Sequence, residues 1–383
     1  VSDPGAPPTR VRRVAVVTVS HRGDDARIAF RQIGALRDAG VDVVYIAPGP
    51  IVHDGPGLER VVIPRATGRR RLRSWRAARA ALGRVAVDVD VILVHDVEVV
   101  PVLAGVAAGT PLVWDVHEDV VASVSDREWI PRWARPLVRP AVAGLESVAR
   151  RGRPLLLAEH RYADRLGNWP VVPNSTRVEP PGPERDRVRG RIVYVGRLST
   201  GRGVETMIEI GRQLGSAAEV LLVGAADRDV VDVVRRAHER GEITWTGPLP
   251  NPDALRLVAT AEVGLSLLRP LPNYLHSMPT KIFEYFARAT PVVTTPLPLA
   301  VDAVEAAGAG LVVDHDDPRA AIDAIAVYLD DPDRRRRDGL AGHRWVAAEH
   351  NWDVDAVGFL AALERYAVPA SSTVDRRSGA HDL

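Results

Sequence analysis

The chain has 383 residues, of which 46% are hydrophobic and 26% are charged, and its formal net charge is +1. This length predicts two or three domains of ordinary size, each with its own core. Because the chain contains no cysteine, it has no disulfide, no thiolate nucleophile and no zinc–sulfur site. Gly, Pro and charged residues interrupt its apolar runs before they reach the roughly 20 residues of a membrane-spanning helix. No signal peptide is recognised, so we expect a soluble, cytoplasmic protein.

Charge is distributed unevenly along the chain. Residues 1–180 carry a net charge of +6, and residues 181–383 carry −5. The basic first half indicates an anionic partner or a membrane surface, or simply reflects chance placement of the many arginines. No nucleic-acid-reading module accompanies the basic residues, so we expect no nucleic acid partner.

Runs of Val, Ile and Leu alternate with segments of helical period through both halves of the chain. The predicted strands lie at 11–20, 41–49, 60–66, 89–96, 110–119 and 153–160, and then at 190–198, 218–226, 243–249, 263–270, 290–298 and 308–317. Continuous apolar strands separated by helices predict parallel sheets covered on both faces. The fold class is therefore α/β, with two doubly wound, Rossmann-like domains facing across a cleft that holds the ligand.

Domain boundaries follow from composition. The Pro- and Gly-rich segment 177–190 is the predicted linker. We expect a disordered tail at 1–10, an N-terminal domain at 11–180, a C-terminal domain at 188–352 and a second disordered tail at 368–383.

The loop after the first strand is polar. It lacks the G-x-G-x-x-G fingerprint, which argues against a nicotinamide or flavin enzyme. Its side chains His21, Arg22 and Asp25 suit hydroxyl and phosphate groups. The alternative is a solvated loop in which Asp24 or Asp25 caps the next helix.

Histidines follow two later strands of the first half. His95 ends one strand, and His117 with Glu118 and Asp119 follows the next. Adjacent side chains in an extended chain point to opposite faces, so one metal ion would not meet all three, and we predict no metal. We expect His117, His95 and Glu118 to line a sugar or acceptor pocket, with a hydrogen-bonded loop histidine as the alternative.

The first loop of the second half is rich in glycine and arginine. Gly196, Gly201 and Gly203 allow close backbone approach to a ligand, and Arg197 and Arg202 lie at the start of the next helix. Two guanidiniums beside a helix N-terminus favour a diphosphate. Similar turns also occur without ligands.

Lys281 is the only lysine in the chain. Pro279 predicts the first helical turn and Ser277 its cap, which leaves Lys281 in that turn, where a cation opposes the helix dipole. An anion beside Lys281 would explain the arrangement, and Glu284, on the same face, could accept hydrogen bonds from a ribose diol. The alternative is a surface Lys281–Glu284 pair, opposite a buried stripe of Ile282, Phe283 and Phe286.

Several segments carry a family resemblance. "VGRLSTGRG", "TGPLPN", "PTKIFEYFARATPVVTT" and "GAGLVV" resemble, in this order, the donor-binding half of retaining GT-B glycosyltransferases of family four, the group 1 type. "DDARIAFRQIGALRDAGVDVVYIAPG", "HDVEVVPVL", "VWDVHED" and "VVPNS" resemble the acceptor-binding half. The resemblance extends from Arg13 to Tyr366. It implies that residues 353–367 form a helix that crosses back to the N-terminal, acceptor-binding domain.

The resemblance implies metal-independent, cofactor-free transfer of a sugar from a nucleoside diphosphate, UDP being the first expectation, to an acceptor hydroxyl. Such a reaction would serve glycan, cell-envelope or natural-product biosynthesis. The implied catalytic residues are His117, Arg197, Arg202 and Lys281. The implied donor site comprises Gly196, Arg197, Arg202, Gly224, Pro248, Leu249, His276, Ser277, Met278, Pro279, Thr280, Lys281, Ile282 and Glu284. The resemblance defines neither the base, the sugar, the acceptor nor the oligomeric state.

Two residues depart from the family pattern. His276 stands where the first Glu of the Glu–seven residues–Glu motif is expected, and Arg202 replaces the usual lysine. Two alternatives therefore stay open: a nucleotide-sugar 2-epimerase of the same fold, and a catalytically silent nucleotide-sugar binder or partner subunit.

Two basic, Trp-bearing segments, 69–85 and 127–145, are either core-packing helices or surfaces for an anionic membrane. Pro136 and Pro140 are expected to interrupt the second segment.

Overall fold

The structure, a computed structural model, describes residues 11–51, 54–107, 109–117, 121, 135–275 and 277–367. Among the predicted features, the two tails, Glu118, Asp119 and His276 lie outside these residues. The chain divides into two units. We call Val1–Asn174 with Val354–Leu383 the N-terminal unit, and Ser175–Asp353 the C-terminal unit.

The N-terminal unit contains a parallel six-stranded sheet with the order β3-β2-β1-β4-β5-β6. Its strands are β1 (Arg13–Val17), β2 (Asp42–Pro48), β3 (Leu58–Ile63), β4 (Val91–Val94), β5 (Leu112–Val116) and β6 (Leu155–Leu157). The strand order reverses between β1 and β4, and at such a switch point the loops that follow the strands diverge and leave room for a ligand.

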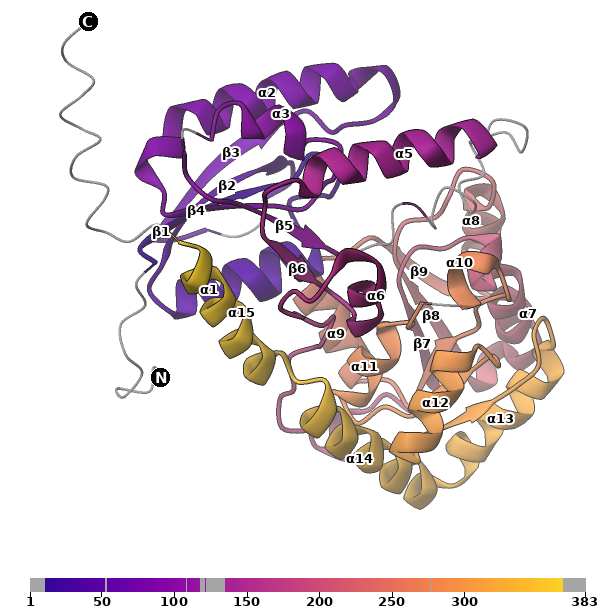
Figure 1. Cartoon of the computed structure of the whole chain (residues 1–383). Coiled ribbons are helices and arrows are strands. Elements are labelled where there is room, and N and C mark those ends of the chain that lie inside the picture. The colour runs from indigo at the N-terminus through magenta and orange to yellow at the C-terminus, as the bar shows by residue number, and fades with distance from the viewer. Residues whose placement is uncertain are drawn as a thin grey trace, which may run out of the picture. The chain divides into compact units, whose positions relative to one another are not determined.

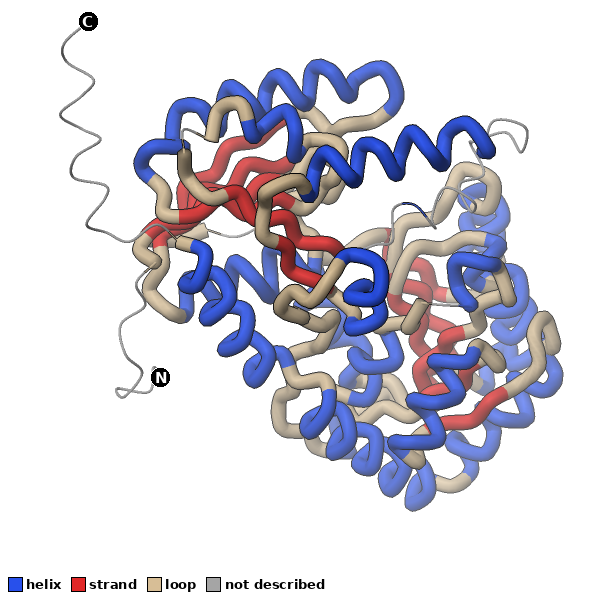
Figure 2. The backbone as a smooth tube through the Cα atoms, viewed as in Figure 1, coloured by secondary structure: helices blue, strands red, loops and turns tan. Residues whose placement is uncertain are grey.

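Helices cover both faces of this sheet (Figures 1 and 2). Its helical segments are η1 (Ala26–Ile33, a π-helix) continued by α1 (Gly34–Asp38), α2 (Arg71–Val85), α3 (Val100–Ala104), α5 (Arg135–Arg150) and α6 (Ala163–Leu166). In Figure 1, α2 and α3 lie on one side, and α1 lies on the other together with α15 (Trp352–Tyr366). On the α2 side, Ala78 and Leu82 pack against strand residues such as Ile92.

The C-terminal unit repeats this order, as β12-β11-β10-β7-β8-β9, again parallel. Its strands are β7 (Arg191–Val195), β8 (Glu219–Val223), β9 (Thr244–Gly247), β10 (Val263–Ser266), β11 (Val292–Thr294) and β12 (Gly310–Val312). Its helices are α7 (Val204–Leu214), α8 (Val231–Glu239), α9 (Asn251–Ala259), α10 (Pro272–Leu275), α11 (Lys281–Phe286), α12 (Pro298–Ala307), α13 (Pro318–Asp330) and α14 (Pro332–Glu349).

The predicted α/β class with two parallel sheets is confirmed. Eleven of the twelve described strands lie inside a segment predicted from an apolar run, and β3 begins two residues before its predicted segment. The central strands are buried, as the continuous apolar runs indicated, whereas β3, β9 and β12 at the sheet edges are partly exposed.

Two helix predictions were wrong. Helix α5 continues through Pro140, at the loss of one intrahelical hydrogen bond, so Pro140 does not interrupt it. Pro136 lies in the first turn, where proline is tolerated, and residues 127–134 of the predicted segment lie outside the described residues. Helix α11 begins after Thr280, and no side chain caps it, so Ser277 is not its cap.

No helix among the described residues is long and apolar enough to cross a membrane. In the basic segment 69–85, Trp75 packs against the core and its Nε1 donates to Glu98. Leu72 is 58% exposed. Helix α2 is therefore a core-packing helix with a basic outer face.

The close packing of α14 against α11 gives a stability prediction. A Cβ on Gly339 would lie 2.2 Å from the backbone oxygen of Ala289, which follows α11. Gly339→Ala should therefore lower the free energy of unfolding by about 1–3 kcal/mol. Gly358 in α15 has no neighbouring atom within 4 Å of an added Cβ, so Gly358→Ala should raise it by about 0.5–1 kcal/mol. Urea denaturation of both variants tests this, and equal effects would contradict the packing.

Candidate functional site

The loop after β7 brings four predicted or neighbouring residues together. Gly196 has φ +137°, and a Cβ there would lie 3.4 Å from Arg202 Nη1, 3.4 Å from Tyr194 Oη and 3.6 Å from Lys281 Cε. An added Cβ would therefore only touch these side chains, and it is the positive φ that favours glycine at position 196. At Gly224, with φ +151°, a Cβ would lie 1.8 Å from the backbone oxygen of Gly196. Both glycines are needed for this loop to lie where it does.

Lys281 is buried without a counter-ion. It is 7% exposed, and its Nζ lies 4.2 Å from the centroid of the Tyr194 ring. Burial, together with the charge of Arg202, lowers the pKa of Lys281 well below its usual value, although Glu284 acts in the opposite direction. Within the described ranges, Lys281 forms no ion pair or hydrogen bond. A cation–π contact offsets only part of the desolvation of an ammonium, since it contributes about 0.5–2 kcal/mol.

Arg202 lies beside Lys281 and faces a second aromatic ring. Its guanidinium carbon lies 5.9 Å from the centroid of Tyr274, and its Nε donates to Tyr274 Oη over 3.4 Å. Because these two neighbouring cations contact aromatic rings and not carboxylates, the C-terminal ends of the strands in this sheet carry a net positive charge here. Such a place favours a multiply charged anion.

Glu284 is also buried, at 8% exposure. Its Oε1 accepts a hydrogen bond from Asn251 Nδ2 over 3.3 Å. The face that carries Lys281 and Glu284 is therefore buried like the opposite face, and the surface-pair alternative is wrong. Asn251 was not predicted; its position at the start of α9, far from Glu284 in sequence, gave no local signal.

Arg197 does not join Arg202 and Lys281 in this structure. Its side chain is 65% exposed, and its Nε pairs with Asp227. Only its backbone approaches the group, because the Arg197 carbonyl accepts a hydrogen bond from Tyr194 Oη over 2.8 Å. We expected Arg197, Arg202 and Lys281 to lie together, but in this structure only Arg202 and Lys281 do.

The remaining predicted donor residues differ in accessibility. Pro248, Leu249 and Ser277 are exposed, Met278 and Thr280 are partly buried, and Pro279 and Ile282 are buried. The Ile282 amide donates to Pro279 over 2.9 Å, and the Ser277 amide donates to Tyr274 over 3.3 Å. These two amides are therefore engaged within the chain.

In the N-terminal unit, His21 lies at the centre of a polar cluster. Its Nδ1 is 3.6 Å from Asp25 Oδ2, and its Nε2 is 3.8 Å from Asp96 Oδ1 and 2.9 Å from His117 Nε2. Asp25 also caps η1 by accepting from the amides of Arg27 and Ile28. Asp25 therefore caps the helix, as one of the two alternatives predicted, and it also lies beside His21.

The hydrogen-bond partners define how protons are arranged in this cluster. His117 Nδ1 lies 3.2 Å from the backbone carbonyl of Asp115, which can only accept, so Nδ1 carries the hydrogen. Burial and the charge of His21 lower the pKa of His117 to about 4. His117 is then neutral at pH 7 with Nε2 as an acceptor, and His21 donates across the 2.9 Å contact.

Asp115 anchors the cluster from β5. Arg27 donates to its Oδ2 through Nε and to its Oδ1 through Nη2, both over 2.8 Å, and Gln32 donates to Oδ2 over 2.8 Å. Burial acts to raise the pKa of Asp115, but Arg27 outweighs it and holds the pKa well below its usual range. Sequence reasoning missed Arg27 and Asp115, because a pair 88 residues apart leaves no local pattern.

His95, Asp115 and His117 bring possible ligand atoms within 4.8 Å of one another. His95 Nδ1 lies 3.2 Å from Asp115 Oδ2, but neither ring nitrogen of His95 has hydrogen-bond geometry to a described residue. A metal ion fits this group poorly, since the Arg27 guanidinium already engages both oxygens of Asp115 and would repel a cation. Arg22 lies apart from the cluster and pairs with Asp24 over 2.8 Å.

Comparisons with known proteins agree with the fold. A family model described as "Glycosyl transferases group 1" matches residues 189–331. A GDP-mannose-dependent alpha-(1-6)-phosphatidylinositol monomannoside mannosyltransferase from Mycobacterium tuberculosis is 27% identical over 220 residues, 55% of this chain and 51% of that protein. The chain thus spans about half the length of the curated relatives it matches.

Similar solved structures cover nearly the whole chain. Sucrose-phosphate synthase from Thermosynechococcus elongatus has a TM-score of 0.66 at 17% identity, over 97% of this chain and all of that one. The Anabaena protein HepE, solved with UDP and glucose, has a TM-score of 0.65 at 14% identity, over 92% of this chain and all of that one. The lipopolysaccharide glycosyltransferase WaaG has a TM-score of 0.63 at 13% identity, over 91% and 98%. The two-sheet fold is that of GT-B glycosyltransferases.

The buried neutral state of His117 gives a pH prediction. In the unfolded chain this histidine takes up a proton near pH 6.5, whereas in the folded chain it does so only near pH 4. The free energy of unfolding should therefore fall as the pH drops from about 6.5 to about 4. Because the side chain is half-buried, we expect a loss of about 1–2 kcal/mol from this group.

Urea titrations at several pH values would measure this loss, with His117→Asn as the comparison. The variant should lose the His117 contribution and show a shallower pH dependence. Identical slopes for the two proteins in this window would contradict the assignment of a neutral His117.

Proposed function

We propose that this protein is a glycosyltransferase that moves a sugar from a nucleoside-diphosphate donor to an acceptor hydroxyl, with retention at the anomeric carbon. One observation carries the proposal: Lys281 and Arg202 meet beside Gly196 with no carboxylate partner among the described residues. A pyrophosphate is the anion that two adjacent cations at the edge of a parallel sheet accommodate best. The match of residues 189–331 to a glycosyltransferase model supports it.

The same cations would act in the reaction. When the bond between sugar and diphosphate breaks, negative charge grows on the departing phosphate, and Lys281 and Arg202 would stabilise it. A bound pyrophosphate also removes the repulsion between the two cations, so binding returns the pKa of Lys281 toward its usual value. Arg197 would join them by exchanging Asp227 for a phosphate oxygen. These residues make a metal ion unnecessary in the proposed reaction.

Glu284 would bind the ribose. Its carboxylate accepts from Asn251 through Oε1, and a carboxylate retains further acceptor capacity for vicinal hydroxyls. Glu284 is three residues after Lys281 on α11, a spacing of about 5–6 Å between Cβ atoms. One helix can thus present a cation to the diphosphate and an acceptor to the sugar of the nucleoside.

We assign the His21–His117 cluster to the acceptor side. A neutral His117 can accept a hydrogen bond from a sugar hydroxyl, and His21 can donate to a hydroxyl or phosphate oxygen. No protein nucleophile is required, because the departing phosphate can take the proton of the attacking hydroxyl. Exclusion of water would then limit hydrolysis of the donor.

The donor is first expected to be a UDP-sugar, in line with the UDP bound by HepE. GDP-mannose is the second candidate, because the mycobacterial relative is named for it. A thermal-shift panel of UDP-, GDP-, ADP- and dTDP-sugars would identify the base, since a bound ligand raises the unfolding temperature according to its affinity. No shift with any of these sugars would contradict donor binding.

Assays with acceptors complete the test. Transfer should persist in EDTA, and NMR of the product should show the anomeric configuration of the donor. Product formed without an acceptor would favour a 2-epimerase. Tight binding of a nucleotide sugar without turnover would favour a catalytically silent binder. This alternative stays open because His276 stands where the family pattern has glutamate, and His276 lies outside the described residues.

Replacement of Lys281 should separate stability from binding. Lys281→Met removes a buried, unpaired cation, so it should stabilise the free protein by about 1–3 kcal/mol. The same change should weaken UDP binding by about tenfold or more, because a hydrogen bond to a charged group contributes about 1.5–3 kcal/mol. Thermal unfolding and calorimetric titration measure the two effects.

Arg197→Ala is the matched comparison. Its side chain is mostly exposed, so the unfolding temperature should change little, and the loss of UDP affinity should be smaller than for Lys281→Met. A destabilised Lys281→Met protein that binds UDP normally would contradict the proposed role of the lysine.

We further propose a cytoplasmic location with peripheral membrane contact through the basic outer face of α2, near the exposed Leu72. Co-sedimentation with anionic vesicles at low salt should show binding that weakens in Leu72→Asp and at high salt, because both apolar insertion and screened charge contribute. No binding to anionic vesicles at low salt would refute this contact.

A further inference from the structure

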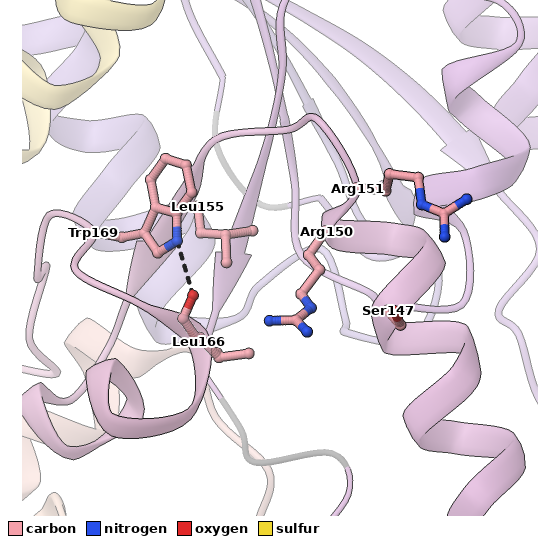
Figure 3. A pocket seen from close by; sticks show the side chains of 6 residues that line it. All are labelled: Ser147, Arg150, Arg151, Leu155, Leu166 and Trp169. Atoms are coloured by element: carbon pink, nitrogen blue, oxygen red, sulfur yellow. Dashed lines mark hydrogen bonds between the residues drawn. The ribbon is translucent and has the colours of Figure 1, made fainter.

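A basic hollow lies at the opposite edge of the N-terminal sheet from His117. It has a volume of about 450 Å³, and its lining includes Arg150, Arg153, Trp169, Arg365 and Tyr366. Its lining also includes the residues directly before β5 and β6, so it is at the amino ends of these strands. An adjoining hollow of about 320 Å³ shares Arg150 and Trp169 (Figure 3).

The dipole of α5 favours Arg150, in its last turn, and Arg153, just after it, but it does not explain Arg365. Cations are favoured where α5 ends, and Arg153 serves there: its Nη1 donates to the carbonyls of Val148 and Ala149 over 2.9 and 3.0 Å. In the described part of the chain, the Arg150 and Arg365 side chains form neither a hydrogen bond nor an ion pair. Figure 3 shows the adjoining hollow, in which Arg150 extends toward Leu166. Arg151 also lines that adjoining hollow, but it does not line the larger one.

No acidic residue lines either hollow. The acidic residue of α5, Glu146, pairs with Arg165 instead. Three guanidiniums therefore share one hollow, with no carboxylate in its described lining, and Arg365 comes from the end of α15 rather than from α5. Like charges gathered from separate elements favour an anion between them.

Two aromatic side chains complete the hollow. Trp169 Nε1 donates to the Leu166 carbonyl over 3.1 Å, which fixes the indole ring. Burial raises the pKa of Tyr366, so its hydroxyl remains a donor at neutral pH. Rings beside guanidiniums provide surface for a planar or apolar group attached to the anion.

We propose that this hollow is a second binding site, for a ligand that carries a phosphoryl group. Arg150 and Arg365 bind the phosphoryl oxygens, Tyr366 donates to them, and Trp169 contacts the organic part. Guanidinium forks match phosphate geometry, and the volume lies within the range of small-molecule sites. The phosphoryl group belongs either to a soluble phosphate ester or to a lipid headgroup.

Binding has a mechanical consequence within the N-terminal unit. Arg365 lies at the end of α15, whereas Arg150 and Arg153 lie at the junction of α5 and β6. A phosphoryl group held by both sides ties the end of α15 to the sheet. The ligand therefore stabilises the docking of this helix, and the unfolding temperature reports its binding.

The test uses the full chain carrying Lys281→Met, so that anion binding at the proposed donor site is weakened. Calorimetric titration with inorganic phosphate and with glycerol 3-phosphate should show binding and a rise in unfolding temperature. Arg365→Ala and Arg150→Ala should each weaken binding by about tenfold, because each removes a charge-assisted contact. Arg151→Ala, at the same helix end but lining only the adjoining hollow, should bind as the parent does. Arg365→Lys retains the charge and should show an intermediate affinity.

A vesicle arm distinguishes the two sources of the phosphoryl group. Binding to the soluble probes alone indicates a phosphate ester, and Arg365-dependent binding to phosphatidylglycerol but not phosphatidylcholine vesicles indicates a lipid headgroup. Either result supports the site. No binding in both arms, or binding that Arg150→Ala and Arg365→Ala leave unchanged while circular dichroism shows both variants folded, would overturn it. The outcome does not depend on glycosyl transfer, so it stands apart from the proposed function.

Discussion

The candidate donor site depends on one electrostatic arrangement: an ammonium and a guanidinium held together in a buried place with aromatic rings for neighbours. Lys281 lies over Tyr194, and Arg202 faces Tyr274. The fold sustains this unfavourable pair because α11, which begins at Lys281, is buried along its whole length and packs under α14. Favourable packing elsewhere in the C-terminal unit thus offsets the repulsion between Lys281 and Arg202, and a bound anion would reduce that repulsion. Sites built for binding commonly sacrifice stability in this way.

The N-terminal unit buries negative charge where the C-terminal unit buries positive charge, because Asp96 and Asp115 lie in its interior. Asp115 is satisfied by Arg27 and Gln32, and Asp96 accepts from Thr18 and Val19. These carboxylates fix the surroundings of His21 and His117. The carboxylates at the carboxyl ends of the strands in this sheet are therefore paired within the chain, whereas Arg150 and Arg365, which line the hollow at the amino ends of β5 and β6, have no side-chain partner among the described residues. The buried carboxylates thus have their partners within the chain, whereas the two arginines would gain a partner only from a bound anion.

How much could be predicted from sequence differs between fold and site. Continuous apolar runs located all twelve strands, because parallel strands buried on both faces need such runs. Single-residue anomalies also carried information: the only lysine proved to be buried, and the capping residue Asp25 lies where its position before η1 indicated. Contacts between distant segments were missed, as with Arg27–Asp115 and Asn251–Glu284. Arg197 shows the remaining limit, since its pairing with Asp227 depends on a neighbouring loop and not on its own motif.

The central claim is that Lys281 is an unneutralised, buried cation that awaits an anionic ligand, and its singularity makes it directly measurable. Labelling the protein with ¹³C-lysine yields one side-chain signal, whose chemical shift can be followed against pH by NMR with and without UDP. The account predicts a pKa well below the usual value in the free protein and a rise toward that value when UDP binds. An ordinary lysine pKa that UDP leaves unchanged would contradict it.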